Sequence, residues 1–306
     1  MLAAIDAGSN TLRLLVGRVN NGKVLPKFYL RRISRLAGDF TQKEGLSPEA
    51  KERTLFAFQE LAKTCLQAEV KQVRVVGTAA FRQAVNGEHF ACEVRQFTQL
   101  PLEIISGKVE AEYMVSGVLS VLEPMPPHAL IVDIGGGSTE FVLCSGQKVL
   151  WSRSIPLGVV RLTEEYTSPL MRQSVIAEAL TALNVELYSV CKSVGLVLDD
   201  LHLVATAGTV TTLAALDMRM TEYDWRQVNN YSIPLSHLRH WQTILTPLSL
   251  SEREKLPGME VGRGDLIMPG LEIILFQMHQ MSTDYLTVSD FGILEGLLLS
   301  LHNNHQ

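Results

Sequence analysis

The sequence predicts an α/β protein made of two similar units that face each other across a cleft. Two observations carry this prediction: apolar strands alternate with amphipathic helices, and one strand–turn–strand pattern occurs twice, as Asp6-Ala7-Gly8-Ser9-Asn10-Thr11 and as Asp133-Ile134-Gly135-Gly136-Gly137-Ser138-Thr139. Each copy places an aspartate at the end of an apolar strand, followed by a turn with glycine and hydroxyl groups. Such an internal repeat indicates a duplicated structural unit.

The first half of the chain reads as three strands, a helix and a second group of short elements. We expect strands at Leu2–Ile5, Leu12–Val19 and Val24 to about Leu36, with Asn20-Asn21-Gly22-Lys23 as the hairpin turn between the last two. Ser47-Pro48 is typical of a helix start, because the serine caps the helix and proline fits its first turn. Strands are expected at Val73–Val76 and Leu102–Ile105, and Ser106-Gly107 begins a helix that runs to about Leu122.

A domain boundary is predicted at Pro124-Met125-Pro126-Pro127, because prolines cannot continue a helix. The predicted domains are residues 1–123 and 124–306, with the last helix free to pack back on the first domain. The second half repeats the order of the first. We expect strands at 129–134, 139–143, 148–154, 201–205 and 285–288, a long amphipathic helix through residues 175–190, a helix opened by Gly208, and a last helix from about Gly292 to Leu301.

Composition limits the class of protein. Of 306 residues, 46% are hydrophobic and 19% charged, which is typical of a folded chain. A net charge of −5 argues against a general nucleic-acid binder but leaves room for a locally positive site. The four cysteines form no C-x-x-C pair, as expected in a reducing compartment. With no signal-like N-terminus and no long uncharged apolar run, we expect a cytoplasmic protein without a membrane span.

The two glycine turns are candidate phosphate-binding loops. Successive backbone N–H groups in such a turn form a concave anion site, and Ser9, Asn10, Ser138 and Thr139 add side-chain donors. Asp6 and Asp133, just before the turns, could hold Mg²⁺. The alternative for each single turn is an ordinary hairpin with an aspartate cap, but two copies in facing positions favour a phosphate site.

Further candidates lie at other strand ends. Gly208-Thr209 is either an anion site at a helix N-terminus or a plain strand-to-helix turn. Arg82 follows the buried strand and Gly77-Thr78, where ligands of α/β sheets bind, or it is a solvated helix residue. Glu110 is either a general base or a partner of the helix dipole. Three smaller groups could have either a functional role or a purely structural, solvent-exposed one. They are Glu140 in its strand, Arg263 with Asp265, and the basic cluster Arg31, Arg32 and Arg35.

These motifs occur in the order found in a known family. Together with Gly77-Thr78-Ala79-Ala80-Phe81-Arg82, Ile105-Ser106-Gly107-Lys108-Val109-Glu110-Ala111, Ala207-Gly208-Thr209 and Ser289-Asp290-Phe291-Gly292-Ile293-Leu294-Glu295-Gly296, the turns make the chain resemble the exopolyphosphatase and guanosine pentaphosphate phosphohydrolase (Ppx/GppA) family. The resemblance covers Ile5 to Gly296. It implies an α/β fold of two ribonuclease-H-like domains of the actin-like ATPase superfamily around an interdomain cleft.

The resemblance also implies roles for individual residues. Glu110 matches the glutamate that activates the attacking water, and Arg82 an arginine that contacts phosphate. Asp133 and Glu140 match acids linked to magnesium, with Asp6 as a third candidate ligand. The implied phosphate- or substrate-binding residues are Gly8, Ser9, Asn10, Thr78, Gly135, Gly136, Gly137, Ser138, Thr139, Gly208 and Thr209.

The sequence departs from the family pattern at Val109, where a second glutamate is usual, and at Ala207, where serine is common. The expected activity is release of orthophosphate from the end of inorganic polyphosphate with Mg²⁺. Alternatives are hydrolysis of guanosine pentaphosphate (pppGpp), a kinase of the same superfamily, and a non-catalytic binding module. We expect no nucleic-acid or membrane partner; a homodimer is allowed for, because the sequence does not fix the oligomeric state.

Overall fold

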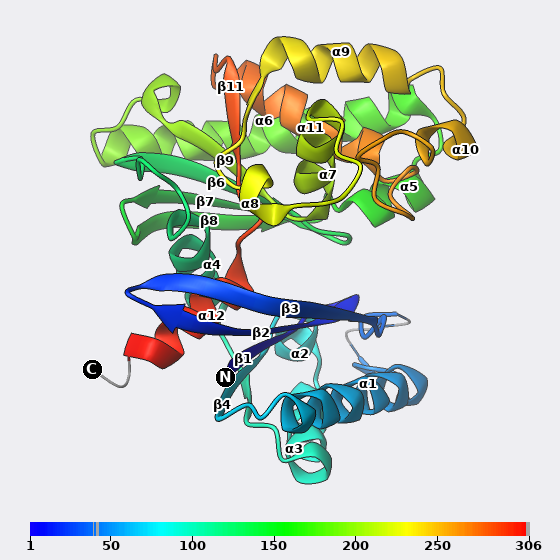
Figure 1. The fold of residues 1–306 in the computed structure, drawn as a ribbon. Helices are drawn as coiled ribbons and strands as arrows, with labels where there is room; N and C mark the ends of the chain where they lie inside the picture. Colours follow the sequence, from blue (N-terminus) through cyan, green and yellow to red (C-terminus); the bar gives the residue numbers. More distant parts are fainter. Residues whose placement is uncertain (39, 41–42, 304–306) are drawn as a thin grey trace. The chain divides into compact units, whose positions relative to one another are not determined.

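The structure is a computed structural model that describes residues 1–38, 40 and 43–303, and it divides into two compact units (Figure 1). Unit 1 comprises Met1–Ser120 and the chain from Gly292 onward, and unit 2 comprises Val121–Phe291. The division thus falls between 120 and 121, where the sequence analysis placed it between 123 and 124. The final helix is grouped with unit 1.

Unit 1 is built on a five-stranded sheet with the order β3-β2-β1-β4-β5. Strands β1, β4 and β5 are parallel, whereas β2 and β3 form an antiparallel meander on β1. The strands are β1 (Leu2–Ala7), β2 (Thr11–Asn20), β3 (Lys23–Ile33), β4 (Gln72–Gly77) and β5 (Leu102–Ile104). The helices are α1 (Pro48–Gln67), α2 (Ala79–Gln83), α3 (Gly87–Thr98), α4 (Gly107–Leu119) and α12 (Ile293–Asn303).

Unit 2 repeats this arrangement with one additional edge strand. Its sheet has the order β10-β11-β9-β6-β7-β8, in which β6, β9 and β11 are parallel and β7 and β8 continue β6 as an antiparallel meander. The strands are β6 (His128–Ile134), β7 (Thr139–Ser145), β8 (Lys148–Ile155), β9 (His202–Thr206), β10 (Ser232–Pro234) and β11 (Tyr285–Val288). The helices are α5 (Val159–Glu165), α6 (Pro169–Ser193), the 3₁₀ turn η1 (Leu198–Asp200), α7 (Gly208–Asp217), α8 (Trp225–Val228), α9 (Leu235–Leu245), α10 (Leu250–Arg253) and α11 (Ile267–Gln280).

The two sheets therefore share one topology, and the duplicated α/β fold class predicted from the sequence is confirmed. In unit 1, the core between the sheet and helices α1 to α3 contains Ile5, Leu14, Phe58, Phe81 and Phe90. Helix α12 packs on α4 and on β1 and β2. Their backbones come so close that a side chain at Gly296 would meet the carbonyl of Tyr113. The glycines of the closing motif thus serve helix packing.

Helix α6 of unit 2 is 25 residues long and has a buried and an exposed face. Ile176, Leu180, Leu183 and Leu187 on its buried face join the unit 2 core. In the described part of the chain it is the one helix that is long and apolar enough to span a membrane by length and composition. Its buried face packs against α11.

Candidate active site

The glycine turn of unit 1 is a tight hairpin between β1 and β2. The N–H of Gly8 donates to the carbonyl of Thr11 at 3.0 Å. The carbonyls of Ser9 and Asn10 accept hydrogen bonds from the segment after β3, from Ala37 and from Ser34 and Arg35. These hydrogen bonds hold the turn against the segment that follows β3. The side chains of Ser9 and Asn10 remain half-exposed.

Asp6 precedes this turn and forms an ion pair across the hairpin. Asp6 lies opposite Arg13 in the β1–β2 register, and Oδ2 accepts from the Nη2 and Nε atoms of Arg13 at 2.7 and 3.1 Å. The Asp6 side chain is 6% exposed. A guanidinium that forms two hydrogen bonds to one carboxylate neutralises it well. Asp6 thus forms an ion pair with Arg13 in this structure, and Asp6 as a magnesium ligand stays a prediction.

Arg82 and Glu110 meet at the carboxyl end of the parallel strands of unit 1. Arg82 Nη1 donates to Glu110 Oε2 at 2.8 Å and to the carbonyl of Ile105 at 2.9 Å. Arg82 lies on α2 after β4, and Glu110 lies in the first turn of α4, which Ser106 caps through a bond from the N–H of Val109. Both side chains are about 30% exposed. The structure thus brings together the predicted arginine and the predicted general base.

The glycine turn of unit 2 has the same backbone frame. The N–H of Gly135 donates to the carbonyl of Ser138 at 3.0 Å, as Gly8 does to Thr11. The carbonyls of Gly135 and Gly136 accept from the N–H groups of residues 159–161 at the start of α5. Gly158 lies so close that a side chain there would meet Gly136. A loop whose carbonyls point backward into such bonds directs its remaining amides outward, as an anion site requires.

Asp133 and Glu140 lie opposite each other on neighbouring strands. They are register partners across β6 and β7, so their side chains share one face of the sheet. Glu140 Oε1 accepts from the hydroxyls of Ser138 at 2.6 Å and Ser154 at 2.7 Å. Glu140 therefore does not simply face solvent, which was the alternative for it. Like charges directly opposite destabilise a sheet, and a cation between them would offset this.

This donor set fits a hard divalent cation. Mg²⁺ is usually held by one or two carboxylates together with substrate phosphates and water, not by a full cage of side chains. No group of three or more His, Cys, Asp or Glu side chains gathers as a metal site in the part of the chain that the structure describes. Asp133 and Glu140 would hold the ion, and Ser138 and Ser154 would orient Glu140.

Three of the predicted substrate-binding threonines have buried side chains, and their role in substrate binding stays a prediction. Thr139 is 0% exposed, and its hydroxyl donates to the carbonyl of Leu157. Thr78 is 4% exposed and donates to the carbonyl of Ala7. Thr209 is 1% exposed and packs on Gly270 of α11. The hydroxyls of Thr78 and Thr139 are thus used within the fold, whereas the buried hydroxyl of Thr209 has no hydrogen-bond partner among the described residues.

The guanidinium of Arg263 lies beside the turn that leads into α7. Ala207, before Gly208, has φ 74° and ψ 170°, a conformation that is strained for a residue with a side chain. A side chain at Gly208 would meet the guanidinium of Arg263, which also pairs with Glu260 at 3.2 Å. Arg263 thus lies at the α7 N-terminus, where the sequence had left it open between a lining and a capping role.

Two further residues at this end of unit 2 were missed as functional candidates. The hydroxyl of Tyr223 donates to Asp290 Oδ1 at 2.6 Å. Burial raises the pKa of Asp290, and Glu260 raises it further, while the bond from Tyr223 acts against both. Burial and the charge of Asp290 raise the pKa of Tyr223. Asp290 could have been found from the sequence, because it belongs to the closing motif. Nothing in the sequence marks Tyr223, Ser154 or Gly158.

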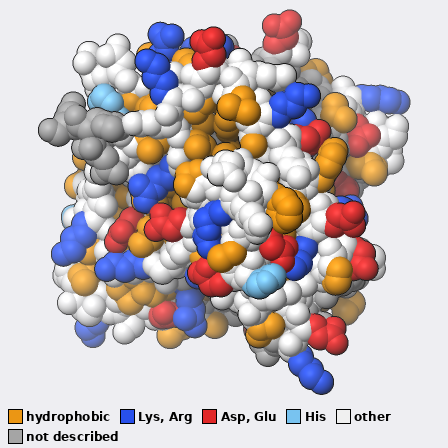
Figure 2. Space-filling model, turned by 90° about the horizontal axis from the view of Figure 1, so that it is seen from below, with side chains coloured by type: hydrophobic (Ala, Val, Ile, Leu, Met, Phe, Trp, Pro, Cys, Tyr) orange, Lys and Arg blue, Asp and Glu red, His pale blue; other side chains and the backbone are white. Residues whose placement is uncertain are grey.

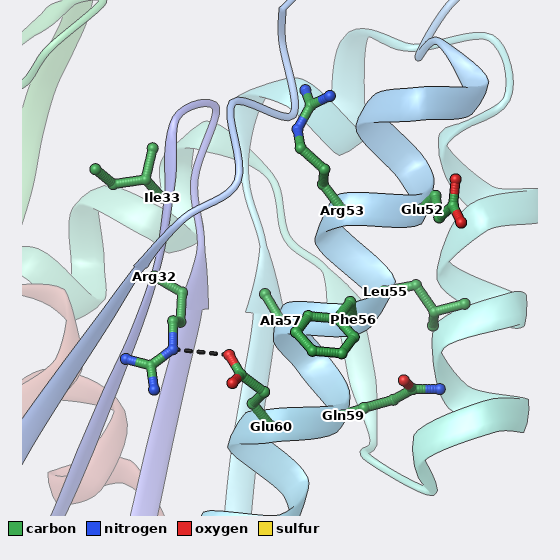
Figure 3. Close-up of a pocket in the computed structure, with 9 residues that line it drawn as sticks. All are labelled: Arg32, Ile33, Glu52, Arg53, Leu55, Phe56, Ala57, Gln59 and Glu60. Carbon is green, nitrogen blue, oxygen red and sulfur yellow. Dashed lines mark hydrogen bonds and ion pairs between the residues drawn. The ribbon is translucent and has the colours of Figure 1, made fainter.

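A surface hollow of about 550 Å³ lies between β3 and α1 of unit 1, apart from these residues (Figure 3). Its lining contains none of the predicted site residues and mixes apolar side chains with charges of both signs. Arg32 faces Glu60 of α1 across it at 2.8 Å. Arg32 of the basic cluster is therefore paired with an acid, and a solvated edge strand explains the cluster better than a polyphosphate track.

Comparison with known proteins decides the family. Residues 15–305 match the model of the Ppx/GppA phosphatase family. The chain belongs to the Ppx/GppA phosphatase family. It is 32% identical to "Exopolyphosphatase 2" of Mycobacterium tuberculosis, with 98% of each chain covered.

Solved structures agree with this assignment. A Ppx/GppA family member from Aquifex aeolicus has a TM-score of 0.82 at 29% identity, covering 100% of this chain and 98% of that one. The type II variant of the Aquifex aeolicus Ppx/GppA phosphatase gives 0.81 at 28% identity, with 98% of each chain covered. The family that the sequence motifs resemble is thereby confirmed, as is the expectation of a phosphoanhydride hydrolase.

Proposed function

We propose that this protein is an exopolyphosphatase that hydrolyses the terminal phosphoanhydride of inorganic polyphosphate and releases orthophosphate. The observation that carries the proposal is the family match over residues 15–305 together with the Arg82–Glu110 pair. The relative named exopolyphosphatase, matched over nearly its whole length, favours polyphosphate over pppGpp, over a kinase substrate and over a non-catalytic module.

Glu110 acts as the general base in this proposal. Phosphoryl transfer to water depends mainly on positioning and on neutralising charge. The Arg82 guanidinium, 2.8 Å away, orients this carboxylate through a charge-assisted hydrogen bond. The other N–H groups of Arg82 offset charge on the transferred phosphoryl group.

The two glycine turns bind phosphate groups through backbone amides. Ser9 and Asn10 add side-chain donors, whereas the Ser138 hydroxyl donates to Glu140 and Ser138 contributes through its backbone. The amides of Gly208 and Thr209 extend the binding surface of unit 2. Asp133 and Glu140 would hold Mg²⁺, which supplies charge neutralisation at the phosphate oxygens when it is bound. Asp6, by contrast, fixes the unit 1 turn through Arg13.

The remaining assignments are supported by more general features. On the face in Figure 2, Lys and Arg side chains are interspersed with Asp and Glu, which supports the absence of a nucleic-acid partner. The four free cysteines support a cytoplasmic location.

The test is phosphate release by the purified protein with Mg²⁺ from short polyphosphate, long polyphosphate and pppGpp in parallel. Glu110→Gln should abolish most release, while Glu112→Gln, two residues further along the same helix and exposed, is the matched control. Faster release from pppGpp than from either polyphosphate would replace the proposed substrate. Ligand binding without release from any of the three would favour the binding module.

A further inference from the structure

Strand β3 is the edge of the unit 1 sheet. In the part of the chain that the structure describes, β2 is its one strand neighbour. Pro26 has no N–H to donate, so a further strand could not pair fully at that position. Residues 27–33, which form the rest of β3, contain no proline. An edge of this kind is where an extended peptide can add to a sheet.

Helix α1 forms a groove with this edge. The surface hollow between β3 and α1, shown in Figure 3, is called the β3–α1 groove below. Phe56 of α1 lines it and is 63% exposed, with Leu55 beside it in the sequence and also in the lining. Peptides that add to a sheet edge gain affinity from backbone hydrogen bonds and specificity from side-chain contacts next to the edge. The β3–α1 groove offers both.

The charge of β3 selects the strand that can pair with it. β3 contains the bases Lys23, Lys27, Arg31 and Arg32 and no acid, although the chain as a whole has a net charge of −5. Like charges directly opposite each other destabilise a strand pair. Two copies of β3 would therefore repel each other, and a strand that pairs with β3 must bring acids.

We propose that an extended acidic segment of a partner protein adds to residues 27–33 of β3 and lies in the β3–α1 groove. Phe28 and Leu30 pack against the core on the α1 side of the sheet. Lys27 and Arg31 alternate with them and so lie on the other face. Side chains of paired strands share a face with their neighbours. The partner segment therefore alternates apolar side chains, turned toward α1, with acids on the face of Lys27 and Arg31.

Polyphosphate fits this groove less well than a peptide. Glu52 and Glu60 are part of the lining, and Glu60 forms an ion pair with Arg32 at 2.8 Å. A polyanion would bring its negative charges close to both acids, which repel it. It would also leave the exposed ring of Phe56 uncovered, because it has no apolar groups. An extended peptide can cover this ring and pair with the backbone of β3.

The first experiment tests strand addition by measuring the binding of labelled peptides to the full chain by fluorescence anisotropy. The probe is a capped peptide of about eight residues that alternates valine with glutamate. Two further peptides are methylated at the backbone nitrogen of every valine or of every glutamate. Because amides of alternate residues point to opposite edges of a strand, one methylated peptide should lose binding and the other should keep it. No binding of the probe, or equal binding of both methylated peptides, would overturn the proposal.

The second experiment locates the peptide on the protein. Phe56→Glu should weaken binding of the probe about tenfold or more, as the loss of an apolar anchor does. Phe97→Glu, at a similarly exposed phenylalanine of α3 outside the groove lining, is the matched control and should bind like the wild type. Lys27→Glu should weaken binding by about twofold to fivefold, and Lys192→Glu on α6 should not.

Two results of the second experiment would contradict the proposal. Equal effects of Phe56→Glu and Phe97→Glu would place the peptide elsewhere on the protein. Displacement of the probe by short polyphosphate, together with unchanged binding in Phe56→Glu, would make β3 a site for polyanions and not for a peptide strand.

Discussion

The two glycine turns share a backbone frame and differ in charge. In both, an aspartate ends the first strand and the same amide closes the hairpin, at Gly8 and at Gly135. The residue opposite the aspartate is Arg13 in unit 1 and Glu140 in unit 2. One turn is thus neutralised internally, whereas the other has two acids side by side. The two turns therefore share a backbone frame, and the Mg²⁺ site that we propose lies in unit 2 alone.

The largest expected effect concerns water activation, for which Glu110 of unit 1 is the proposed general base. Glu110→Gln should lower turnover by about 10²–10⁴-fold, because an amide cannot accept the proton of water. Steady-state phosphate release with saturating polyphosphate and Mg²⁺ measures it. Turnover of this variant within a factor of two or so of the Glu112→Gln control would remove the role of Glu110 as base.

The Mg²⁺ concentration needed for activity tests most directly whether the ion binds at the unit 2 turn and not at the unit 1 turn. Asp133→Asn should raise the Mg²⁺ concentration for half-maximal activity by about tenfold or more, since lost metal contacts have effects of this size. Asp6→Asn should leave that concentration unchanged, whatever it does to the rate. Titrating Mg²⁺ against phosphate release for both variants measures this. Equal shifts in the two variants would mean that both turns hold the ion.

Stability without metal should fall when the Asp6–Arg13 ion pair is broken. Asp6→Asn removes the charge that lies opposite Arg13 and should lower the free energy of unfolding by about 1–3 kcal/mol. Urea denaturation in EDTA measures it. An unchanged free energy of unfolding would show that this ion pair does not stabilise the turn of unit 1.

The smallest expected effect is on the orientation of Glu140. Ser154→Ala removes one of two hydroxyl donors to Glu140 Oε1 and should raise the Mg²⁺ requirement by roughly tenfold or less. Ser152→Ala, an exposed serine two residues earlier on β8, is the matched control. An unchanged requirement in Ser154→Ala would limit that hydroxyl to holding β8 against β7.

The sequence by itself determined the duplicated fold and the two turns, because glycine conformation and strand alternation are local properties of a few adjacent residues. Tertiary structure alone decided which groups meet. Arg82 and Glu110 are 28 positions apart and come together because parallel β4 and β5 end at one sheet edge. The burial of the Thr139 and Thr209 hydroxyls likewise could not be predicted from the sequence, because it depends on contacts with Leu157 and with Gly270 of α11. Local pattern fixes where a turn forms, and long-range packing fixes what its side chains can reach.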